Sequence, residues 1–415
     1  MTIPFVDIAI VGGGPGGLAL AQGLRKNGLE AAVFERDAVR ADYVQGFRLR
    51  LRQRGLDALE ANLPAHLFEA FLATLGRAPT ENLTFDEHFR PIEGGLSRHE
   101  AEDTHVEKSV SRITLRQILL SGLGASLHIG KTFVRYEVEP AGTVLTHFAD
   151  GSQVRSNILV GADGAGSAVR KQLLPHLVSI DTGVRRLAGK MTLSAAAAHG
   201  IEPALLEHNA NIRPREGHNL MITSHRVDPG AFSHHGLIGS DDPSHRDIGG
   251  FHFNNTTSYV WWNTAYEVDE LGTDAVIETL GGAELLQVLL SRISHWDERI
   301  LKLIRHTDPS TVALLKVKTS QPGAVWETGP VTLLGDAIHA MTYFRALGGN
   351  TALYDTGLLV PQLVAARRNG KPILQALRDY EDAMREHGYE AVRSSLTAMQ
   401  NNVAAGRTLK GVAAE

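Results

Sequence analysis

The stretch "FVDIAIVGGGPGGLALAQGLRKNGLEAAVFER" runs from Phe5 to Arg36 and decides the fold. Its first seven residues are apolar or β-branched apart from one aspartate, which is typical of a buried parallel strand. A glycine-rich turn follows, and the leucines between positions 18 and 24 then recur with helical spacing. Gly28 is expected to end that helix, and "EAAVFER" predicts a second strand. The stretch therefore predicts a β-α-β unit.

Three glycines of this turn, Gly12, Gly14 and Gly17, fit the pattern G-x-G-x-x-G between a predicted strand and a predicted helix. Such glycines allow a tight turn, let the backbone approach a pyrophosphate, and let helix and strand pack closely. Glu35 ends the second strand, where a carboxylate accepts hydrogen bonds from the ribose hydroxyls of an adenosine. Arg36 is either a solvated strand end or a side chain that stacks near the adenine. The combination predicts a dinucleotide site, and the alternative is a turn that packs without a ligand.

A second strand-to-helix turn, "GDAIHAMTYFRALGGN", covers residues 335–350. The run "VTLL" before it predicts a buried strand, so Asp336 is expected at the carboxyl end of that strand, where ligands bind in open α/β sheets. We expect Asp336 to accept a hydrogen bond from a cofactor hydroxyl. Gly348, Gly349 and Asn350 precede a predicted helix, whose positive end stabilises negative charge on a ligand. Two such turns serving one long cofactor favour FAD over NAD.

The sequence between the two turns predicts that a second domain is inserted into an α/β fold. The ends of the chain show strand–helix alternation, whereas the middle shows short β-like runs with few helical patterns. We therefore predict a Rossmann-like FAD-binding domain with an inserted, mainly antiparallel β-sheet substrate domain. The FAD-binding domain would comprise residues 1–75, 105–172 and 275–395, the substrate domain residues 76–104 and 173–274, and a C-terminal helix or tail residues 396–415.

The composition excludes several classes of function. The 415 residues carry 41 basic and 46 acidic side chains, for a net charge of −5, which gives no support to nucleic-acid binding. With no cysteine, disulfides and thiolate metal sites are excluded, and we expect a bound organic cofactor and no metal. The sequence predicts no membrane span and no secretory signal, so we expect a cytoplasmic protein. It does not indicate an oligomeric state.

Four motifs, in this order along the chain, resemble those of the group A (aromatic-hydroxylase type) FAD-dependent monooxygenases. "VGGGPGG" with Glu35 resembles the site for the FAD pyrophosphate and ribose, and "SRITLRQILL" resembles a helix whose second arginine, here Arg116, contacts the flavin cofactor. "LVGADGAGSAVRK" resembles a motif in which Asp163 and Gly164 would serve FAD and pyridine-nucleotide binding. "GDAIHAMTYFRALGGN" resembles the motif in which Asp336 would hold the ribityl chain. Within the family, the resemblance is closest to tetracycline-inactivating monooxygenases and related natural-product hydroxylases.

Two positions of the last motif depart from the family. Tyr343 stands where a proline is usual, and Ala346 where a glycine is usual. The proline lines the flavin site, so a tyrosine there would narrow the pocket or contact the substrate. The departures put the position of the flavin ring in question.

The resemblance implies a chemistry centred on the flavin. NADPH or NADH would reduce FAD transiently, and reduced flavin would react with O2 to give a C4a-hydroperoxide that inserts one oxygen atom into an aromatic or polycyclic small molecule. Such reactions occur in secondary metabolism and in the modification of xenobiotics. Two alternatives of the same fold stay open, a halogenase-like or reductase-like flavoprotein and a non-catalytic binding protein.

The resemblance implies no catalytic triad. The candidates for a catalytic role are Tyr343, His339 and Arg48. His339 is either a base for a phenolic substrate or a histidine fixed by its neighbours at the start of a helix. Arg48 would lie near the isoalloxazine ring or on an exposed strand face.

The predicted middle sheet would form the wall of a substrate pocket opposite the flavin. Alternation places Tyr259 and Trp261 on one face of a strand and Trp262 on the other. Such aromatic side chains either line a pocket for a planar substrate or pack in the core of the sheet. The candidate substrate residues are Arg213, His218, Met221, Phe253, Trp261 and Tyr343.

Overall fold

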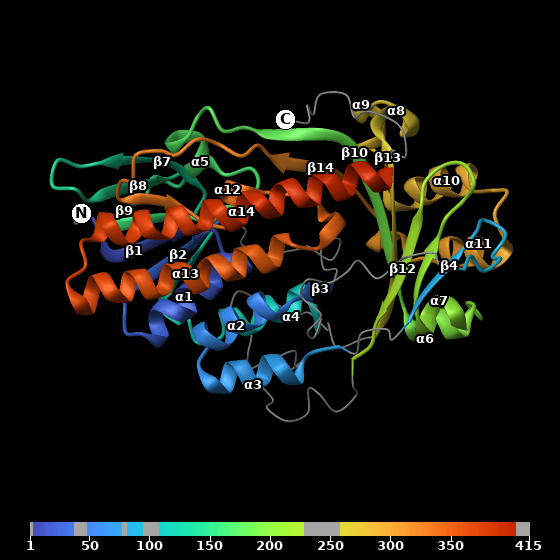
Figure 1. Ribbon diagram of the computed structural model, residues 1–415, viewed down its shortest axis with the longest axis horizontal. Coiled ribbons are helices and arrows are strands. Elements are labelled where there is room, and N and C mark those ends of the chain that lie inside the picture. Colours follow the sequence, from blue (N-terminus) through green and yellow to red (C-terminus); the bar gives the residue numbers. More distant parts are fainter. Residues whose placement is uncertain (1–2, 37–47, 77–80, 94–107, 228–257, 404–415) are drawn as a thin grey trace.

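The computed structural model describes residues 3–36, 48–76, 81–93, 108–227 and 258–403. They form two β-sheets, each with its own helices and its own hydrophobic core (Figure 1). Segments from both ends of the chain build the first sheet and its cover, and the middle of the chain builds most of the second. Within these residues, no helix is both long and apolar enough to cross a membrane.

The first sheet contains the strands predicted around the glycine turn. Its order over the described residues is β6-β2-β1-β9-β8-β7, and β15 also pairs with β9. The apolar run of β1 is buried from Ile8 to Val11, and β1 lies parallel between β2 and β9, as expected for a strand covered on both faces. The strands are β1 (Phe5–Val11), β2 (Ala31–Glu35), β6 (Leu127–Ile129), β7 (Phe133–Val138), β8 (Val144–Phe148), β9 (Gln153–Gly161) and β15 (Val331–Leu333).

Helices from distant parts of the sequence cover this sheet. The long helices α13 and α14 pack against each other, and α13 also packs against α1 and α2, so the C-terminal helices close the N-terminal unit (Figure 1). A two-stranded ribbon of β3 (Arg48–Leu51) and β5 (Lys108–Ser111) lies beside them. The helices are α1 (Pro15–Lys26), α2 (Gln53–Asn62), α3 (Ala65–Ala73), α4 (Arg112–Leu120), η1 (Gly124–Ser126), α5 (Ala168–Leu173), α12 (Asp336–His339), η4 (Tyr343–Arg345), α13 (Gly348–Asn369) and α14 (Ile373–Val403).

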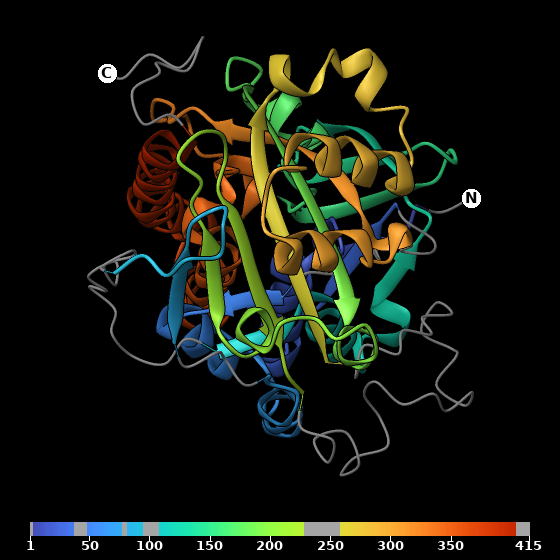
Figure 2. The ribbon, with the colours of Figure 1, turned by 90° about the vertical axis from the view of Figure 1, so that its right-hand side faces the viewer.

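The second sheet has the order β14-β10-β13-β12-β11-β4 over the described residues and is antiparallel except where β4 meets β11. Helices cover one of its faces (Figure 2). Its strands are β4 (Asn82–Phe85), β10 (Ser179–Thr192), β11 (Asn209–Ile212), β12 (Leu220–His225), β13 (Tyr259–Glu267) and β14 (Ala313–Ser320). Its helices are α6 (Leu193–Ala198), α7 (Pro203–Glu207), α8 (Val268–Leu271), α9 (Asp274–Ile277), α10 (Gly282–Arg292), α11 (Glu298–Arg305) and η3 (Pro309–Thr311).

Two predicted boundaries differ from the structure. Residues 275–320 were expected in the FAD-binding domain, but α10 and α11 pack into the core of the second sheet, and β14 pairs with β10. A helical pattern shows that a helix has an apolar face and does not show which sheet covers it, so this segment was misassigned. The C-terminal helix or tail predicted from residue 396 does not begin a new element, because α14 continues through that position to Val403.

The two tryptophans of β13 illustrate how this sheet is built. Trp262 is fully buried in the core under the helices, and its Nε1 donates to Thr307 Oγ1 at 2.8 Å. Trp261 and Tyr259 lie on the opposite face, in a small separate cluster with Ala188. The predicted alternation is confirmed. It places Trp262 in the core under the helices and Tyr259 and Trp261 on the face that these helices do not cover.

We expect Trp262→Ala to lower the free energy of unfolding by about 3–5 kcal/mol, because it leaves a cavity in a closed core and removes the hydrogen bond to the Thr307 hydroxyl. Trp261→Ala, one residue away on the other face, is the matched control and should lower the free energy of unfolding by clearly less. Urea unfolding of both variants measures the difference, and equal losses would contradict the assignment of the two faces.

Candidate cofactor site

Parallel register aligns the carboxyl ends of three strands of the first sheet. Val11 of β1 lies opposite Gly161 of β9, and Gly161 lies opposite Leu333 of β15. β2 ends beside them, since Gly12 N donates to Phe34 O. The four strands β2, β1, β9 and β15 therefore finish at one edge of the sheet, and β2 and β15 stand three strand spacings apart, roughly 14 Å.

This edge gathers most of the predicted cofactor residues. Glu35 ends β2, Gly12 follows β1, Asp163 and Gly164 follow β9, and Asp336 follows β15. Residues separated by three hundred positions thus meet along a single line, which suits an extended ligand better than one phosphate.

The first glycine turn is closed on one side and open on the other. Gly12 has φ +114°, and a Cβ placed on Gly17 would lie 2.1 Å from Gly12 O. Both positions therefore need glycine for local geometry. Gly14, the N-cap of α1, has no atom of the described residues within 4 Å of such a Cβ. The open side of the turn faces the N-terminal end of a twelve-residue helix, where backbone N–H groups attract an anion.

Two charged side chains fix the middle of this turn. Glu35 is buried and accepts a hydrogen bond from Gly13 N. Arg116, on α4, is also buried and donates from Nε to Gly13 O at 3.1 Å. The structure thus brings Glu35 and Arg116, both predicted cofactor residues, to the turn. Arg116 also supports the backbone of the turn through its bond to Gly13 O. Arg36 is exposed at the end of β2.

The second motif places a carboxylate at the next strand end. Asp163 Oδ2 accepts from Ala168 N at 2.7 Å and Val169 N at 3.3 Å, at the start of α5. Asp163 Oδ1 is buried without a hydrogen-bond partner in the described part of the chain. This orphaned oxygen faces the same edge and fits a ligand that donates a hydrogen bond.

Asp336 begins α12, and its side chain is exposed. A Cβ on Gly348, at the start of α13, would lie 3.6 Å from Asp336 Oδ1, so the start of α13 and this carboxylate are close neighbours. Asn350 acts differently from the prediction, because it ties α13 to the N-terminal segment. Its Oδ1 accepts from Arg52 N, and its Nδ2 donates to Arg50 O, both at 2.7 Å. Gly349 lies in the same first turn, against Leu49.

The family departures have a structural explanation. Ala346 has φ +52°, the left-handed conformation that favours glycine. Tyr343 is stacked on Phe344, and its ring lies 4.2 Å from the guanidinium carbon of Arg186 on β10. Trp261 lies 5.3 Å from the same guanidinium carbon. Burial raises the pKa of Tyr343 to about 12 and lowers that of Arg186.

Tyr343, Trp261 and Arg186 thus join the second turn to the second sheet. The sequence predicted the two aromatic residues separately and missed Arg186. In the β10–β13 pairing Lys190 lies opposite Trp261 and Arg186 lies opposite Ala265, so Arg186 reaches Trp261 along the same face of the sheet, and the sequence alone does not give this register.

Arg48 lies at the start of β3, close to the second sheet. Burial and the charge of Arg48 lower the pKa of His225 to about 4, which keeps that imidazole neutral. Ser109 Oγ lies 2.8 Å from His225 Nδ1, so the β3–β5 ribbon contacts β12 here. Arg48 is therefore half-buried at the junction of the two sheets and does not lie on an exposed strand face.

The remaining substrate candidates do not form one group. His218 pairs with Glu270 at 2.7 Å and lies by Tyr266, which belongs to the helix-covered face of the second sheet, opposite Trp261. Met221 is 40% exposed on the Trp261 face, and Arg213 N bonds Phe85 O at the end of β11. Phe253 lies outside the described residues. His218 and Trp261, both candidate substrate residues, therefore lie on opposite sides of the second sheet.

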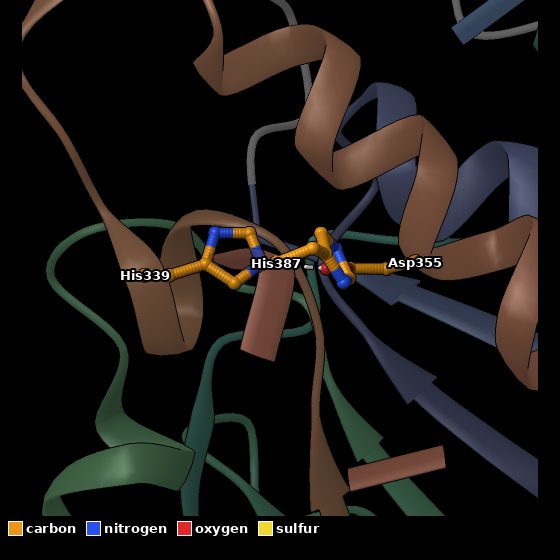
Figure 3. A group of neighbouring side chains, drawn as sticks. All are labelled: His339, Asp355 and His387. Carbon is orange, nitrogen blue, oxygen red and sulfur yellow. Dashed lines mark hydrogen bonds and ion pairs between the residues drawn. The ribbon is translucent and has the colours of Figure 1, made fainter. Parts of the chain in front are cut away.

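His339 lies in a buried group with Asp355 and His387 (Figure 3). Its Nε2 is 2.8 Å from Asp355 Oδ2, and its side chain is fully buried. The structure therefore supports the second interpretation of His339, a histidine fixed by its neighbours. The three potential ligand atoms lie within 4.8 Å of one another, which the sequence did not indicate because the residues are dispersed over nearly fifty positions.

The geometry agrees with the comparisons to known proteins. The family described as FAD binding domain matches residues 5–207 and 298–395, more than half of the chain. The chain belongs to this FAD-binding family. The matched ranges leave out the part of the chain that contains β12, β13 and α10.

The chain is also similar to individual monooxygenases. The FAD-dependent monooxygenase dbaB of Emericella nidulans is 29% identical over 380 residues, which cover 89% of each chain. The dual O-methyltransferase/FAD-dependent monooxygenase elcB of Phaeosphaeria nodorum is 28% identical over 85% of this chain but only 40% of its own length. The chain spans about half, or less, of the first curated relatives that it matches.

Solved structures show the same fold. A candidate FAD-containing monooxygenase from Photorhabdus luminescens is 30% identical with a TM-score of 0.79, covering 96% of this chain and 98% of its own. The tetracycline destructase Tet(51) has a TM-score of 0.63 at 15% identity, covering 97% of this chain and 92% of its own. The predicted aromatic-hydroxylase fold and the resemblance to group A monooxygenases are confirmed.

Gly14→Ala tests the open side of the glycine turn. We expect the apoprotein to keep its free energy of unfolding within about 0.5 kcal/mol, since the new methyl group meets open space. FAD binding should weaken about tenfold or more, because the methyl group fills the approach to the backbone. Quenching of flavin fluorescence on titration measures the binding.

Gly329→Ala is the matched control, because its Cβ also meets open space but lies just before β15, away from the strand ends. Equal FAD affinity in Gly14→Ala and Gly329→Ala would contradict a ligand at this turn.

The buried Asp355–His339 pair predicts a pH dependence of stability. Burial would raise the pKa of Asp355, but the charge and hydrogen bond of His339, together with His387, outweigh it and lower that pKa. Burial would lower the pKa of His339, but Asp355 outweighs it and raises that pKa. Asp355 therefore stabilises the fold above its unfolded pKa of about 3.9, and His339 stabilises it below its unfolded pKa of about 6.5.

We expect the difference in unfolding free energy between wild type and Asp355→Asn to be largest between about pH 4 and pH 6.5. It should decrease as the pH falls through the lowered pKa of Asp355 and as it rises through the raised pKa of His339. Urea unfolding at a series of pH values measures the difference. A difference that does not change with pH would contradict the coupling.

Proposed function

We propose that this protein is an FAD-dependent monooxygenase that uses NADPH or NADH and O2 to insert one oxygen atom into an aromatic or polycyclic small molecule. The observation that carries the proposal is the common edge formed by the ends of β2, β1, β9 and β15, with Glu35, Asp163 and Asp336 along it. Membership of the FAD-binding family and the similarity to named monooxygenases support it.

The residues at this edge divide between the two halves of FAD. The Gly12–Gly14 turn and the start of α1 would hold the diphosphate, with Glu35 beside the adenosine ribose. Asp163 Oδ1 and Asp336 would accept hydrogen bonds from hydroxyls of the other half. Arg116 would keep the turn in shape through Gly13. When bound, FAD supplies the redox chemistry, and the protein contributes position, exclusion of water and electrostatics.

The substrate would lie against the face of the second sheet that carries Trp261. Trp261 and Tyr343 approach Arg186 from the sheet and from the second turn, so aromatic faces and a cation lie together where the two parts of the molecule meet. A planar, electron-rich molecule matches such a surface. Arg48 and the neutral His225 extend it along β12.

The proposal is tested by a screen of phenolic and polyketide compounds. Natively purified protein should be yellow and absorb near about 450 nm, because the flavin carries the chemistry. A substrate should stimulate NADPH or NADH consumption and give a product heavier by one oxygen atom in mass spectrometry. A colourless protein that does not bind added FAD would contradict the proposal and favour a binding protein of the same fold. A flavin-containing protein whose products gain no oxygen would favour the halogenase-like or reductase-like alternative.

With a substrate in hand, Trp261→Ala should raise KM about two- to tenfold, the range expected for losing one aromatic contact. The matched control is Trp326→Ala, which removes another tryptophan beside an arginine, 4.6 Å from Arg385, away from the second sheet. Steady-state kinetics measure both. Unchanged KM in Trp261→Ala would exclude this face as the substrate wall.

A further inference from the structure

Asp355 is the centre of a buried polar group that joins three helices (Figure 3). The carboxylate is fully buried on α13. Its Oδ2 accepts from Gly335 N at 2.7 Å and lies 2.8 Å from His339 Nε2 of α12. Its Oδ1 lies 2.9 Å from His387 Nε2 of α14. Three donors therefore satisfy one carboxylate that would otherwise be costly to bury.

Hydrogen bonds at both ring nitrogens hold His387 in place. Its Nδ1 lies 2.8 Å from Ala383 O on the same helix, and its Nε2 lies 2.9 Å from Asp355 Oδ1. His387 therefore supports one oxygen of the Asp355 carboxylate, while His339 Nε2 supports the other.

The group bears directly on the second turn. Gly335 has φ +64° and ψ −141°, and its N–H is held by Asp355. The held N–H belongs to the Leu334–Gly335 peptide, and Asp336 is the next residue, so fixing this peptide restricts where the Asp336 carboxylate can lie. Close packing reinforces the contact, since a Cβ on Gly388 of α14 would lie 2.6 Å from His339 Cδ2. The three helices cannot shift separately without disturbing the turn.

We propose that Asp355, paired with His387, is a positioning residue for the cofactor: it fixes the Leu334–Gly335 peptide, directly before Asp336, and thereby holds the Asp336 carboxylate in register with FAD. This inference rests on the proposed function, because it takes FAD as the ligand of Asp336. Asp355 itself is buried behind the turn and acts through the backbone N–H of Gly335.

The same three residues could instead hold a metal ion. Each histidine Nε2 already lies at hydrogen-bond distance from a different oxygen of Asp355, so protons occupy the positions that a metal would need. The observations therefore favour the hydrogen-bonded group, and metal content becomes an outcome of the test.

The decisive experiment is a double-mutant cycle on FAD affinity. Apoprotein of the wild type, Asp355→Asn, Asp336→Asn and the double variant is titrated with FAD, and quenching of flavin fluorescence gives each Kd. We expect each single variant to bind about tenfold more weakly or worse, as for the loss of a hydrogen bond to a charged group. If Asp355 acts through Asp336, the double variant should be at most about threefold weaker than Asp336→Asn alone. Independent, multiplying losses would overturn the inference.

Further variants separate positioning from loss of the fold. Glu386→Gln, exposed on α14 one residue before His387, is the control and should leave the Kd unchanged. If Asp355→Asn does not fold, His387→Gln takes its place in the cycle, since it keeps the Asp355–Gly335 bond and removes only the imidazole beside Asp355 Oδ1. His387→Gln is then expected to weaken FAD binding, and to do so only while Asp336 is present.

The outcomes distinguish the inference from the proposed function. If wild-type apoprotein does not bind FAD, the proposed function fails. If it binds FAD and Asp355→Asn binds equally well, only the positioning role fails. Elemental analysis of the purified protein completes the test, because one equivalent of zinc, manganese or iron that is lost in Asp355→Asn would replace the positioning role by a metal site.

Discussion

The parallel register of β1, β9 and β15 is the constraint on which the candidate site depends. Val11, Gly161 and Leu333 lie at one level, so the chain leaves three strands at the same edge and returns through helices behind them. A shift of one residue in either pairing would turn every side chain of the shifted strand to the other face. The apolar residues of β1 and β9 are buried on both faces, which leaves no room for such a shift. The site is thus a consequence of how the core packs.

Close backbone contacts turn this alignment into a binding edge. The contact of Gly17 with Gly12 O keeps α1 close to β1, so that the helix begins at the level of the strand ends. Asp163 ties the start of α5 to the end of β9, because its Oδ2 accepts from Ala168 N, and Arg170 ties α5 to α12, because its Nη1 donates to Ala337 O at 2.9 Å. Asn350 joins the start of α13 to the segment that follows β3. The contacts of Arg170 and Asn350 connect residues that lie far apart in sequence, which explains why the C-terminal helices belong to the N-terminal unit.

The sequence predicted the parts of this arrangement that depend on local pattern. The β-α-β unit, the acid at the end of β2 and the acid after β15 follow from strand length, glycine spacing and helix period, and all are found in place. Contacts that depend on tertiary packing were out of reach. Arg186 is one charged residue in a long strand, and only its pairing with β13 brings it to Trp261. Asp355 and His387 sit on two helices whose mutual packing no local pattern encodes. The assignment of α10 and α11 also depends on tertiary packing. Their apolar faces could cover either sheet, and in the structure they pack on the second.

At Ala346 and Tyr343, where the sequence departs from the family pattern, neighbouring contacts stabilise the turn. A left-handed alanine costs about 1–2 kcal/mol relative to its ordinary conformation, so the turn must be held by other contacts. Those contacts exist on both sides of the turn: Asn350 Nδ2 donates to Ala346 O at 3.0 Å, and Tyr343 stacks on Phe344 and lies on Arg186. A proline at position 343 would fix the local backbone but could reach neither ring nor guanidinium. With tyrosine at this position the backbone is less restricted than with proline, but the side chain contacts the second sheet through Arg186. Because of this contact, the turn forms part of the wall against which a substrate would lie.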